Sequence, residues 1–297
     1  MKNIIIVTGG AGFVGTNMIK LLLSKTRYKI ISLDNYSSGS KKNHIKNIRV
    51  KYLKFECAKI DLALKKYKKN IKSIFHFGEF SRIYQSFLKM DQCLNSNTIG
   101  TNAVFNFCLK NKVKLIYSAT SATLGNNGND KNLSPYAFTK AKNLELLENL
   151  KQWFNFNFEV IYFYNVYGPG QISRGKMATV IGIFEDQYLK NKPLSVVKPG
   201  DQNRRFTHID DTCKICYLAW KKNKRLHYSI SNTKSYSIIN IAKLFSNKIK
   251  FLPARKGERF ASAMTDMNLS NKVHKYYGKI NIKDYIDDFK KKHKILR

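Results

Sequence analysis

Short apolar runs, separated by glycines and an amphipathic segment, open the chain. Ile4–Val7 is apolar throughout, Thr8–Gly15 is rich in glycine, and an amphipathic stretch then ends near Ser24. A second, largely apolar run at Lys29–Leu33 stops at Asp34. Apolar runs of this length are typical of buried strands, whereas apolar positions three and four apart indicate a helix. The pattern predicts a strand, a tight turn, a helix and a second parallel strand.

The same alternation continues to about residue 165. The predicted elements are a strand at Val50–Phe55, a helix at Ile60–Lys69, a strand at Ile74–Phe77, a helix at Asp91–Asn111, a strand at Lys114–Ser118, a helix at Tyr136–Trp153 and a strand at Glu159–Tyr164. Strands that alternate with helices build a parallel sheet covered on both faces. We therefore predict an α/β fold with a Rossmann-type doubly wound parallel sheet in residues 1–165.

The pattern changes after Asn165, where Gly168-Pro169-Gly170 interrupts it. Shorter elements follow: a helix at Thr179–Leu189, a strand at Leu194–Val197, a helix at Asp211–Lys221, a strand at Tyr228–Ile230, a helix at Ile238–Phe245 and a basic tail. No linker of low complexity separates the two parts. Residues 166–297 are predicted to form a smaller C-terminal α/β substrate lobe, with segments free to interleave and the active site between the lobes.

The glycine-rich turn has the chemistry of a dinucleotide site. A strand that ends at Val7 faces the first turn of the next helix, where free N–H groups and the helix dipole favour an anion. Gly9 suits the tight turn, Gly12 lets a pyrophosphate approach, and Gly15 allows close helix packing. Asp34 ends the second strand, where it would accept hydrogen bonds from a ribose and repel a 2′-phosphate. This favours NAD over NADP.

Length and composition bound the remaining possibilities. A chain of 297 residues can bury a large core. It has no apolar run long enough to span a membrane, and its start does not resemble a signal peptide, so a cytoplasmic location and no membrane partner are expected. The five cysteines are predicted to be reduced and mostly buried. Cys213 and Cys216 have no matching Cys or His pair at a finger-like spacing, so no metal site is expected.

The formal net charge of +35 could indicate nucleic-acid binding. The lysines, however, are spread along the whole chain among Asn, Ile, Phe and Tyr residues, as an AT-rich genome would encode them. We interpret most of them as a solvated surface and expect no nucleic-acid partner, although the charge would attract an anionic nucleotide.

Tyr136 and Lys140 are the strongest candidates for catalysis. Four residues apart on a helix, they share one face, and a nearby ammonium stabilises a phenolate. The phenol thereby becomes a usable base near neutral pH. Upstream, Tyr117–Thr123 leaves the end of a predicted strand and offers several hydroxyls to bind or relay a proton.

These motifs together resemble the extended short-chain dehydrogenase/reductases, and within them the NAD-dependent sugar epimerase/dehydratase family that includes UDP-glucose 4-epimerases. The matching blocks are Thr8–Gly15, Leu33–Gly39, Asn97 with Gly100–Asn102, Tyr136 with Lys140, Asn165–Pro169 and Arg204–Asp211. The resemblance covers nearly the whole chain.

The resemblance implies a role for each matched residue. Tyr136 would be the base, Lys140 would hold the nicotinamide ribose, and Thr120, or its neighbour Ser121, would be the hydroxyl partner. The residues implied to bind NAD are Gly9, Gly12, Phe13, Val14, Gly15, Asp34, Asn35, Ser38, Gly39, Phe77, Gly78, Asn97, Ser118, Tyr136 and Lys140. The residues implied to bind substrate are Glu79, Arg82, Thr120, Tyr136, Asn165, Arg204 and Arg255. Arg255 belongs to the block Arg255–Glu258.

The sequence departs from the family in three places. An Asp that usually contacts adenine is absent from the stretch Phe55–Asp61, so that contact is lost or shifted. The acids that follow the hydroxyl partner in dehydratases and decarboxylases are replaced by Ser121-Ala122. Glu79 is unusual for the group, and either touches the sugar or pairs with Arg82.

The resemblance and the missing acids together favour NAD-dependent epimerisation of a nucleotide-activated hexose, at C4 of a UDP-sugar, through a transient 4-keto intermediate with the cofactor held throughout. A 4,6-dehydratase, a 4-keto-sugar reductase and a non-catalytic NAD- or RNA-binding module remain alternatives. Carbohydrate metabolism, including cell-surface polysaccharide biosynthesis, and a homodimer formed through a four-helix bundle of helices near Asn97–Lys110 and Tyr136–Leu150 are also implied.

Overall fold

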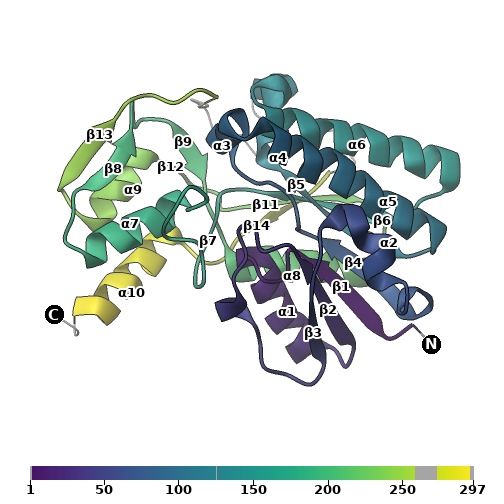
Figure 1. The fold of residues 1–297 in the computed structure, drawn as a ribbon. Helices are drawn as coiled ribbons and strands as arrows, with labels where there is room; N and C mark the ends of the chain where they lie inside the picture. Colours follow the sequence, from purple (N-terminus) through teal and green to yellow (C-terminus); the bar gives the residue numbers. More distant parts are fainter. Residues whose placement is uncertain (1, 125, 258–272, 295–297) are drawn as a thin grey trace.

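The computed structural model describes residues 2–124, 126–257 and 273–294. Glu258, the last residue of the block Arg255–Glu258, lies outside these residues. Figure 1 shows a larger lobe built on an open sheet and a smaller lobe on the side of the C-terminus.

An eight-stranded sheet with the order β14-β11-β6-β5-β4-β1-β2-β3 forms the centre of the larger lobe. Every adjacent pair in it is parallel. Its strands are β1 (Ile4–Thr8), β2 (Lys29–Asp34), β3 (Val50–Lys54), β4 (Ile71–His76), β5 (Lys114–Thr120), β6 (Phe158–Phe163), β11 (His227–Ser231) and β14 (Val273–Tyr277). The order reverses between β1 and β4, which confirms the doubly wound sheet and marks the position where such folds bind ligands.

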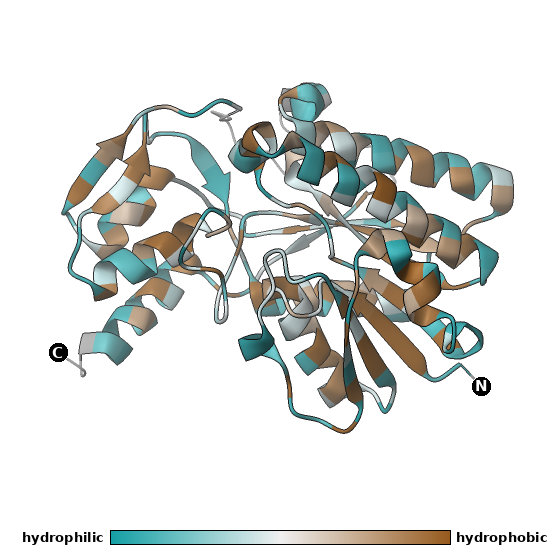
Figure 2. Ribbon diagram, in the orientation of Figure 1, coloured by the Kyte–Doolittle hydropathy of each residue, from teal (hydrophilic) through white to brown (hydrophobic). Residues whose placement is uncertain are grey.

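Helices cover both faces of this sheet. They are α1 (Phe13–Lys25), α2 (Ile60–Leu64), α3 (Ile83–Leu88), α4 (Met90–Leu94), the π-helical turn η4 (Asn95–Gly100), α5 (Thr101–Lys110), α6 (Pro135–Phe154) and α8 (Ile209–Lys222). Successive side chains of β1 point to opposite faces of the sheet, as the period of a strand requires. Ile6 belongs to a core with Leu147 of α6, and Ile5 to a core with Met18 of α1 and Trp220 of α8. Figure 2 shows the strands as mostly hydrophobic and the outer surfaces of the helices as mixed.

The smaller lobe has a core of its own around Phe184, Phe245 and Ile286. Its helices and the short strands that pair with one another are α7 (Val180–Leu189), α9 (Ile238–Phe245), α10 (Ile282–Lys294), β7 (Val166–Tyr167) with β10 (Thr207–His208), β8 (Leu194–Val197) with β13 (Ile249–Leu252), and β9 (Asn203–Arg205) with β12 (Ser235–Ser237). Short 3-10 helices lie between the elements of the N-terminal half of the chain. They are η1 (Lys41–Asn43), η2 (Cys57–Lys59), η3 (Lys68–Asn70), η5 (Ser121–Thr123) and η6 (Asn126–Asn132).

The chain returns to the larger lobe after residue 166. Strands β11 and β14 extend the sheet beyond β6, and α8 packs beside α1 on one of its faces. The two lobes therefore interleave along the sequence instead of meeting at a single boundary near residue 165.

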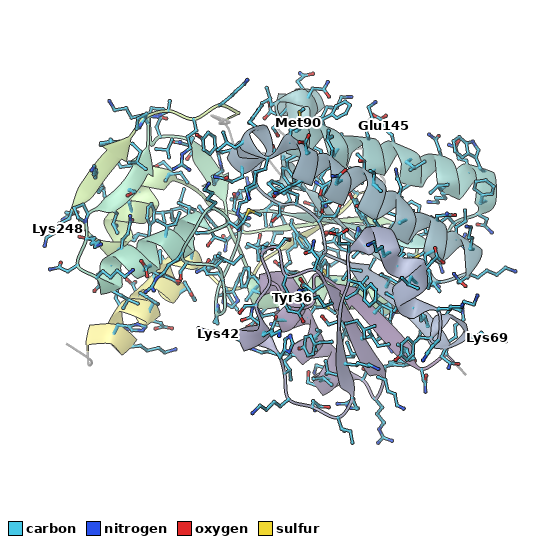
Figure 3. The ribbon with its side chains drawn as sticks, in the orientation of Figure 1. Tyr36, Lys42, Lys69, Met90, Glu145 and Lys248 are labelled. Carbon is cyan, nitrogen blue, oxygen red and sulfur yellow. The ribbon has the colours of Figure 1, made fainter. Side chains whose placement is uncertain are left out.

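The surface carries the basic charge. Figure 3 shows Lys42, Lys69 and Lys248 at the outside of the molecule, and all three side chains are exposed. Cys57 is partly buried, and the other four cysteines are buried and free. In the part of the chain described here, no helix is long and apolar enough to cross a membrane.

Candidate functional site

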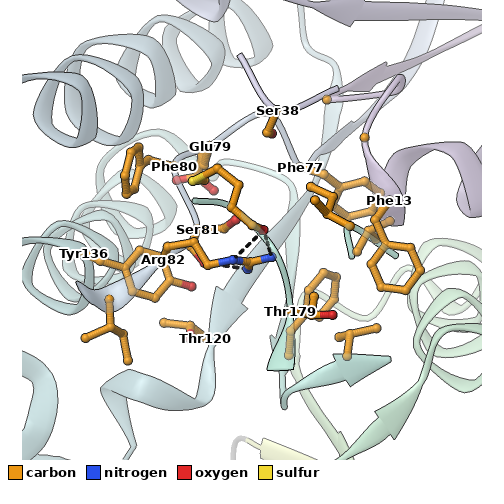
Figure 4. A pocket seen from close by; sticks show the side chains of 18 of the residues that line it. Phe13, Ser38, Phe77, Glu79, Phe80, Ser81, Arg82, Thr120, Tyr136 and Thr179 are labelled. Atoms are coloured by element: carbon orange, nitrogen blue, oxygen red, sulfur yellow. Dashed lines mark hydrogen bonds between the residues drawn. The ribbon is translucent and has the colours of Figure 1, made fainter. Parts of the chain in front are cut away.

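A cavity of about 1130 Å³ lies where the two lobes meet. The ends of β1, β2, β4, β5 and β6 contribute residues to one side of it, and the smaller lobe contributes Thr179, Arg204 and Ile238. This is the carboxyl edge of the sheet, next to the reversal of strand order. Figure 4 shows part of its interior.

The glycine-rich turn forms one wall of the cavity. Gly9 has a φ of +67°, which favours glycine, and its N–H donates to the Leu33 carbonyl at 2.8 Å. A Cβ on Gly15 would lie 2.1 Å from the Gly9 carbonyl oxygen, so Gly15 packs against the turn itself. We had expected it to allow the helix to pack on the strand. Gly12 caps α1 without a side-chain hydrogen bond. The first turn of α1, with Phe13 and Val14, therefore faces the cavity, and a helix N-terminus of this kind favours an anion.

Asp34 is held at the end of β2 with its carboxylate beside this turn. Its Oδ2 accepts from the Ala11 N–H at 2.9 Å and its Oδ1 from the Tyr36 N–H at 2.7 Å. Burial raises the pKa of the Asp34 carboxyl, and the two backbone hydrogen bonds oppose that rise. A Cβ on Gly39 would lie 2.9 Å from Asp34 Oδ2, so Gly39 leaves room for the carboxylate.

Most of the remaining residues predicted to bind the cofactor line the cavity. They are Asn35, Ser38, Phe77, Gly78 and Ser118. Glu56, Cys57 and Ala58 line the same cavity, and they come from the stretch where the family's adenine-contacting Asp is missing. Asn97 does not line it.

Asn97 is fully buried and bonded elsewhere. Its Oδ1 accepts from the Phe80 N–H at 2.7 Å, and its Nδ2 donates to the Phe80 carbonyl at 3.1 Å and to Thr139 Oγ1 at 3.2 Å. The side chain therefore connects the loop after β4 to α6 through hydrogen bonds. We correct the predicted cofactor contact accordingly and leave Asn97 out of the proposed cofactor site.

The start of α6 places the predicted catalytic pair in the cavity. Ser134 Oγ accepts from the Ala137 N–H at 3.1 Å and Pro135 occupies the first turn, two signals that begin a helix. Tyr136 and Lys140 follow one turn apart, are almost fully buried, and both line the cavity.

Two hydroxyls lie on the same wall at the end of β5. Thr120 Oγ1 accepts from the Ala122 N–H at 3.2 Å and so caps the short turn η5, while Ser121 is the next residue of that turn. Both are buried and line the cavity with Tyr136. The structure thus keeps both candidates for the hydroxyl partner at the site, and Figure 4 shows Thr120 near Tyr136.

Glu79 pairs with Lys140, which sequence reasoning missed. The two side chains form an ion pair and are 2% and 3% exposed, respectively. Glu79 Oε1 also accepts from the hydroxyls of Thr101 at 3.0 Å and Tyr117 at 3.1 Å. Lys140 Nζ donates in addition to the Ser118 carbonyl at 2.5 Å. We therefore correct the expectation that Glu79 pairs with Arg82. Contact of Glu79 with the sugar stays a prediction, since Glu79 lines the cavity.

A chain of hydrogen bonds connects this carboxylate to the end of β1. Thr8 Oγ1 accepts from the N–H groups of Phe77 at 3.1 Å and Gly78 at 3.0 Å, so its own proton points to His76 Nδ1 at 2.7 Å. His76 Nε2 then donates to Thr101 Oγ1 at 3.1 Å, and Thr101 donates to Glu79. We assign the His76 tautomer from this network. Burial lowers the pKa of His76 to about 4, so the ring is neutral.

Arg82 is anchored in the same cavity, beside Tyr136. Its Nε and Nη2 donate to the Met177 carbonyl at 3.0 and 2.7 Å, which links the loop before α3 to the loop before α7. Burial lowers the pKa of the Arg82 guanidinium, and the nearby Tyr136 raises it. Figure 4 shows the guanidinium inside the pocket.

The three other predicted substrate residues line the part of the cavity that faces the smaller lobe. Asn165 Nδ2 donates to the Arg205 carbonyl at 2.8 Å. Arg204 is buried in β9, and the Arg255 guanidinium lies over the Tyr84 ring at 5.2 Å from its centroid. Arg204 and Arg255 therefore line the same cavity although they are 51 residues apart in the sequence, counted from position 204 to position 255.

A model of the NAD dependent epimerase/dehydratase family matches residues 5–240. The chain belongs to this family. Within the NAD-dependent epimerase/dehydratase family, it is 29% identical over 261 residues to an ADP-L-glycero-D-manno-heptose-6-epimerase from Brachyspira hyodysenteriae, which covers 83% of this chain and 81% of that protein. It is 26% identical over 285 residues to a putative UDP-glucose 4-epimerase from Methanocaldococcus jannaschii, covering 92% and 88% of the two chains.

Its fold is similar to that of UDP-N-acetylglucosamine 4-epimerase from Methanobrevibacter ruminantium in complex with UDP-N-acetylmuramic acid. The TM-score is 0.83 at 24% identity, over 100% of this chain and 99% of the other. Members of the NAD-dependent epimerase/dehydratase family use NAD, and the residues present here fit that cofactor. The tight turn at Gly9, the α1 N-terminus without a side-chain cap, and the carboxylate of Asp34 all line one end of the cavity. Among the described residues, no group of three or more His, Cys, Asp and Glu side chains could hold a metal ion.

Proposed function

We propose that this enzyme epimerises a nucleotide-activated hexose at C4, with a UDP-sugar as substrate and a 4-keto sugar as transient intermediate. Tyr136 accepts the proton of the C4 hydroxyl and later returns it, and Thr120 or Ser121 orients that hydroxyl. Lys140 provides the positive charge that favours the phenolate. Bound NAD supplies the acceptor and donor of hydride for such a cycle.

The observation that carries this proposal is the distribution of carboxylates in the cavity. Among the described residues that line it, the only acids are Asp34, Glu56 and Glu79. Asp34 is the last residue of β2, Glu56 follows β3, and Glu79 forms an ion pair with Lys140. In the part of the chain that the structure describes, no acid therefore lies next to Thr120 to remove or donate a proton at a second carbon. This favours epimerisation over dehydration or decarboxylation.

Arg204, Arg255 and Asn165 are the candidates for binding the nucleotide part of the substrate. A guanidinium forms paired hydrogen bonds with phosphate oxygens, and Arg204 and Arg255 reach the cavity from the smaller lobe. We propose that they bind the diphosphate, with Asn165 beside them.

The test is to incubate the purified protein, without added cofactor, with UDP-, GDP- and dTDP-hexoses and to identify the products by NMR. A new C4 epimer is the expected product. A 4-keto-6-deoxy product, detected by its absorbance in alkali, would instead indicate a 4,6-dehydratase. A requirement for added reduced cofactor would indicate a 4-keto-sugar reductase. No turnover together with salt-dependent RNA binding would support the non-catalytic alternative.

Replacing Tyr136 with Phe should lower kcat by about 10² to 10⁴ fold, because only the proton-accepting oxygen is lost. The protein should still retain NAD, measured by releasing and quantifying the nucleotide from the purified variant. Tyr277→Phe is the matched control, since Tyr277 is 50% exposed. Full turnover in the Tyr136 variant would remove this residue from the mechanism.

A homodimer, a cytoplasmic location and a place in carbohydrate or cell-surface polysaccharide metabolism remain proposals that rest on the family resemblance. Ile99 and Phe138, on the two helical segments of the expected four-helix bundle, are 58% and 44% exposed and would be covered in such a dimer. Light scattering on the purified protein tests the dimer, and a monomeric mass would rule it out.

A further inference from the structure

The Arg82 guanidinium carries a charge that no carboxylate in the described structure balances. Its hydrogen-bond acceptors are neutral backbone carbonyls, those of Met177 and, at 3.0 Å from Nη1, of Ser81. A guanidinium has five N–H donors, of which these contacts use three. Two N–H groups and a full positive charge are therefore left for a ligand.

The described carboxylates that line the cavity form no ion pair with the Arg82 guanidinium. Glu79, which is near in sequence, is engaged with Lys140, Thr101 and Tyr117. Arg82 is partly buried, so its charge keeps only part of its contact with water. Partial burial of a cation without an anionic partner is unfavourable, so such groups are usually paired. Anchoring Arg82 on two carbonyls holds it in place at the cost of leaving its charge unpaired, an arrangement that favours binding of an anion.

The position of Arg82 indicates which part of a nucleotide sugar it meets. It lies on the side of Tyr136 and Thr120, and Figure 4 shows its guanidinium pointing into the pocket between these residues and Thr179. Arg204 and Arg255 reach the cavity from β9 and from the stretch after β13 in the smaller lobe. The diphosphate thus has its own arginines, while Arg82 is beside the proton-accepting phenol, where the hexose must lie.

We propose that Arg82 selects a nucleotide sugar whose hexose bears a carboxylate, such as a hexuronate. This inference rests on the proposed function, since it takes Tyr136 as the position of the reacting sugar carbon. The two free N–H groups of the planar guanidinium suit the two oxygens of a carboxylate, and this pairing would place the negative charge beside the guanidinium inside the cavity. A neutral hexose would leave the charge unpaired.

The test measures binding of UDP, UDP-glucose and UDP-glucuronate by calorimetry to the NAD-loaded protein. A Tyr136→Phe background prevents turnover. The expected result is that UDP-glucuronate binds at least about tenfold more tightly than UDP-glucose, the range for a charge-assisted hydrogen-bonded pair. Arg82→Met should remove this preference and leave the affinity for UDP unchanged. Arg82→Lys should retain part of it.

Controls separate the possible failures. Arg174→Met removes the same charge from a side chain that is 71% exposed, and should keep the preference. Equal affinity for the acidic and neutral sugars before mutation would overturn the inference. An equal loss for all three ligands in Arg82→Met would also overturn it, by assigning Arg82 to the diphosphate. If UDP and both sugars fail to bind at all, the proposed function itself is wrong and this inference falls with it. Retained NAD in each variant shows that the fold is intact.

Discussion

Glu79 and Lys140 show how a single unusual residue changes the electrostatics of a site. Burial lowers the pKa of the Lys140 ammonium, and the adjacent Glu79 carboxylate raises it. The pair thus keeps Lys140 charged in surroundings that would otherwise favour its neutral form. The proposed function requires a charged Lys140 to favour the Tyr136 phenolate. Under that proposal, Glu79 acts on the chemistry through Lys140.

Replacing Glu79 with Gln should move the alkaline limb of the kcat–pH profile to lower pH. Lys140 loses its partner in this variant, its pKa falls, and the ammonium is lost at a lower pH than in the wild type. The measurement is kcat from pH 6 to pH 10 with the sugar identified by the product screen. Glu145→Gln, which breaks the exposed pair with Lys142, should leave the profile in place. A uniform loss of activity with no shift would show that Glu79 has only a structural role.

His76 should make the fold sensitive to mild acid. Burial lowers its pKa to about 4, while an unfolded histidine titrates near 6.5. Between these values the unfolded state binds a proton that the native state does not, so stability falls as the pH decreases. The loss should reach about 3 kcal/mol at pH 4.

Urea unfolding at pH 7, 6, 5 and 4 measures this effect. The comparison is with His76→Gln, which keeps a polar side chain in the network and has no titrating group there. Its free energy of unfolding should be lower than the wild-type value at pH 7 and should fall less steeply with acid. Parallel pH dependences in the two proteins would mean that His76 is not the group responsible.

At the scale of the element, the N-terminus of α6 determines where Tyr136 lies. Ser134 caps this helix only two positions before Tyr136, and Ser237 caps α9 in the smaller lobe in the same way, with its Oγ accepting from the Asn240 N–H at 3.2 Å. Replacing either serine with Ala should lower the free energy of unfolding by about 1 kcal/mol.

The two cap variants should differ in activity. Ser134→Ala loosens the turn that carries Tyr136 and should reduce kcat. Ser237→Ala should not, because the helix that Ser237 caps carries none of the residues of the proposed proton transfer. Thermal unfolding and steady-state kinetics on both variants make the comparison. Similar kcat values for the two would show that the cap does not position Tyr136.

The elements that sequence predicted well are those with strong local signals. The helix predicted from Tyr136 begins at Pro135 behind a serine cap, and the strand Leu194–Val197 and the helix Ile238–Phe245 have the bounds that we expected. The fourth strand runs from Ile71 to His76 and not from Ile74 to Phe77, because its pairing with β1 starts where a lysine and a serine interrupt the apolar run.

Features that depend on tertiary contacts were missed. The segment predicted as one helix at Asp91–Asn111 contains the π-helical turn η4, and no local pattern marks that change. Strand β14 and helix α10 lie in what was interpreted as a basic tail. The ion pair of Glu79 and Lys140 joins residues 61 positions apart, so only the folded sheet brings them together. The glycine turn, Asp34 and the Tyr136 pair were identifiable because each belongs to a local motif.

At the scale of the whole molecule, the net charge of +35 should act on the rate at which anionic ligands arrive. Stopped-flow association of UDP with the NAD-loaded protein should slow by about tenfold between roughly 10 and 150 mM salt, because salt screens long-range attraction. Uridine, which lacks the diphosphate, should show little change. The same salt dependence for both ligands would contradict electrostatic steering.

The return of the chain to the sheet also limits how this protein can be divided. A fragment that stopped at residue 165 would lack β11, leaving the hydrogen-bonding edge of β6 bare, and would lack α8, uncovering the apolar side chains around Ile5 and Ile161. Bare edges and uncovered apolar faces promote aggregation. The N-terminal half should therefore be insoluble when expressed alone, and a split version of the enzyme would need its break in a surface loop within one lobe.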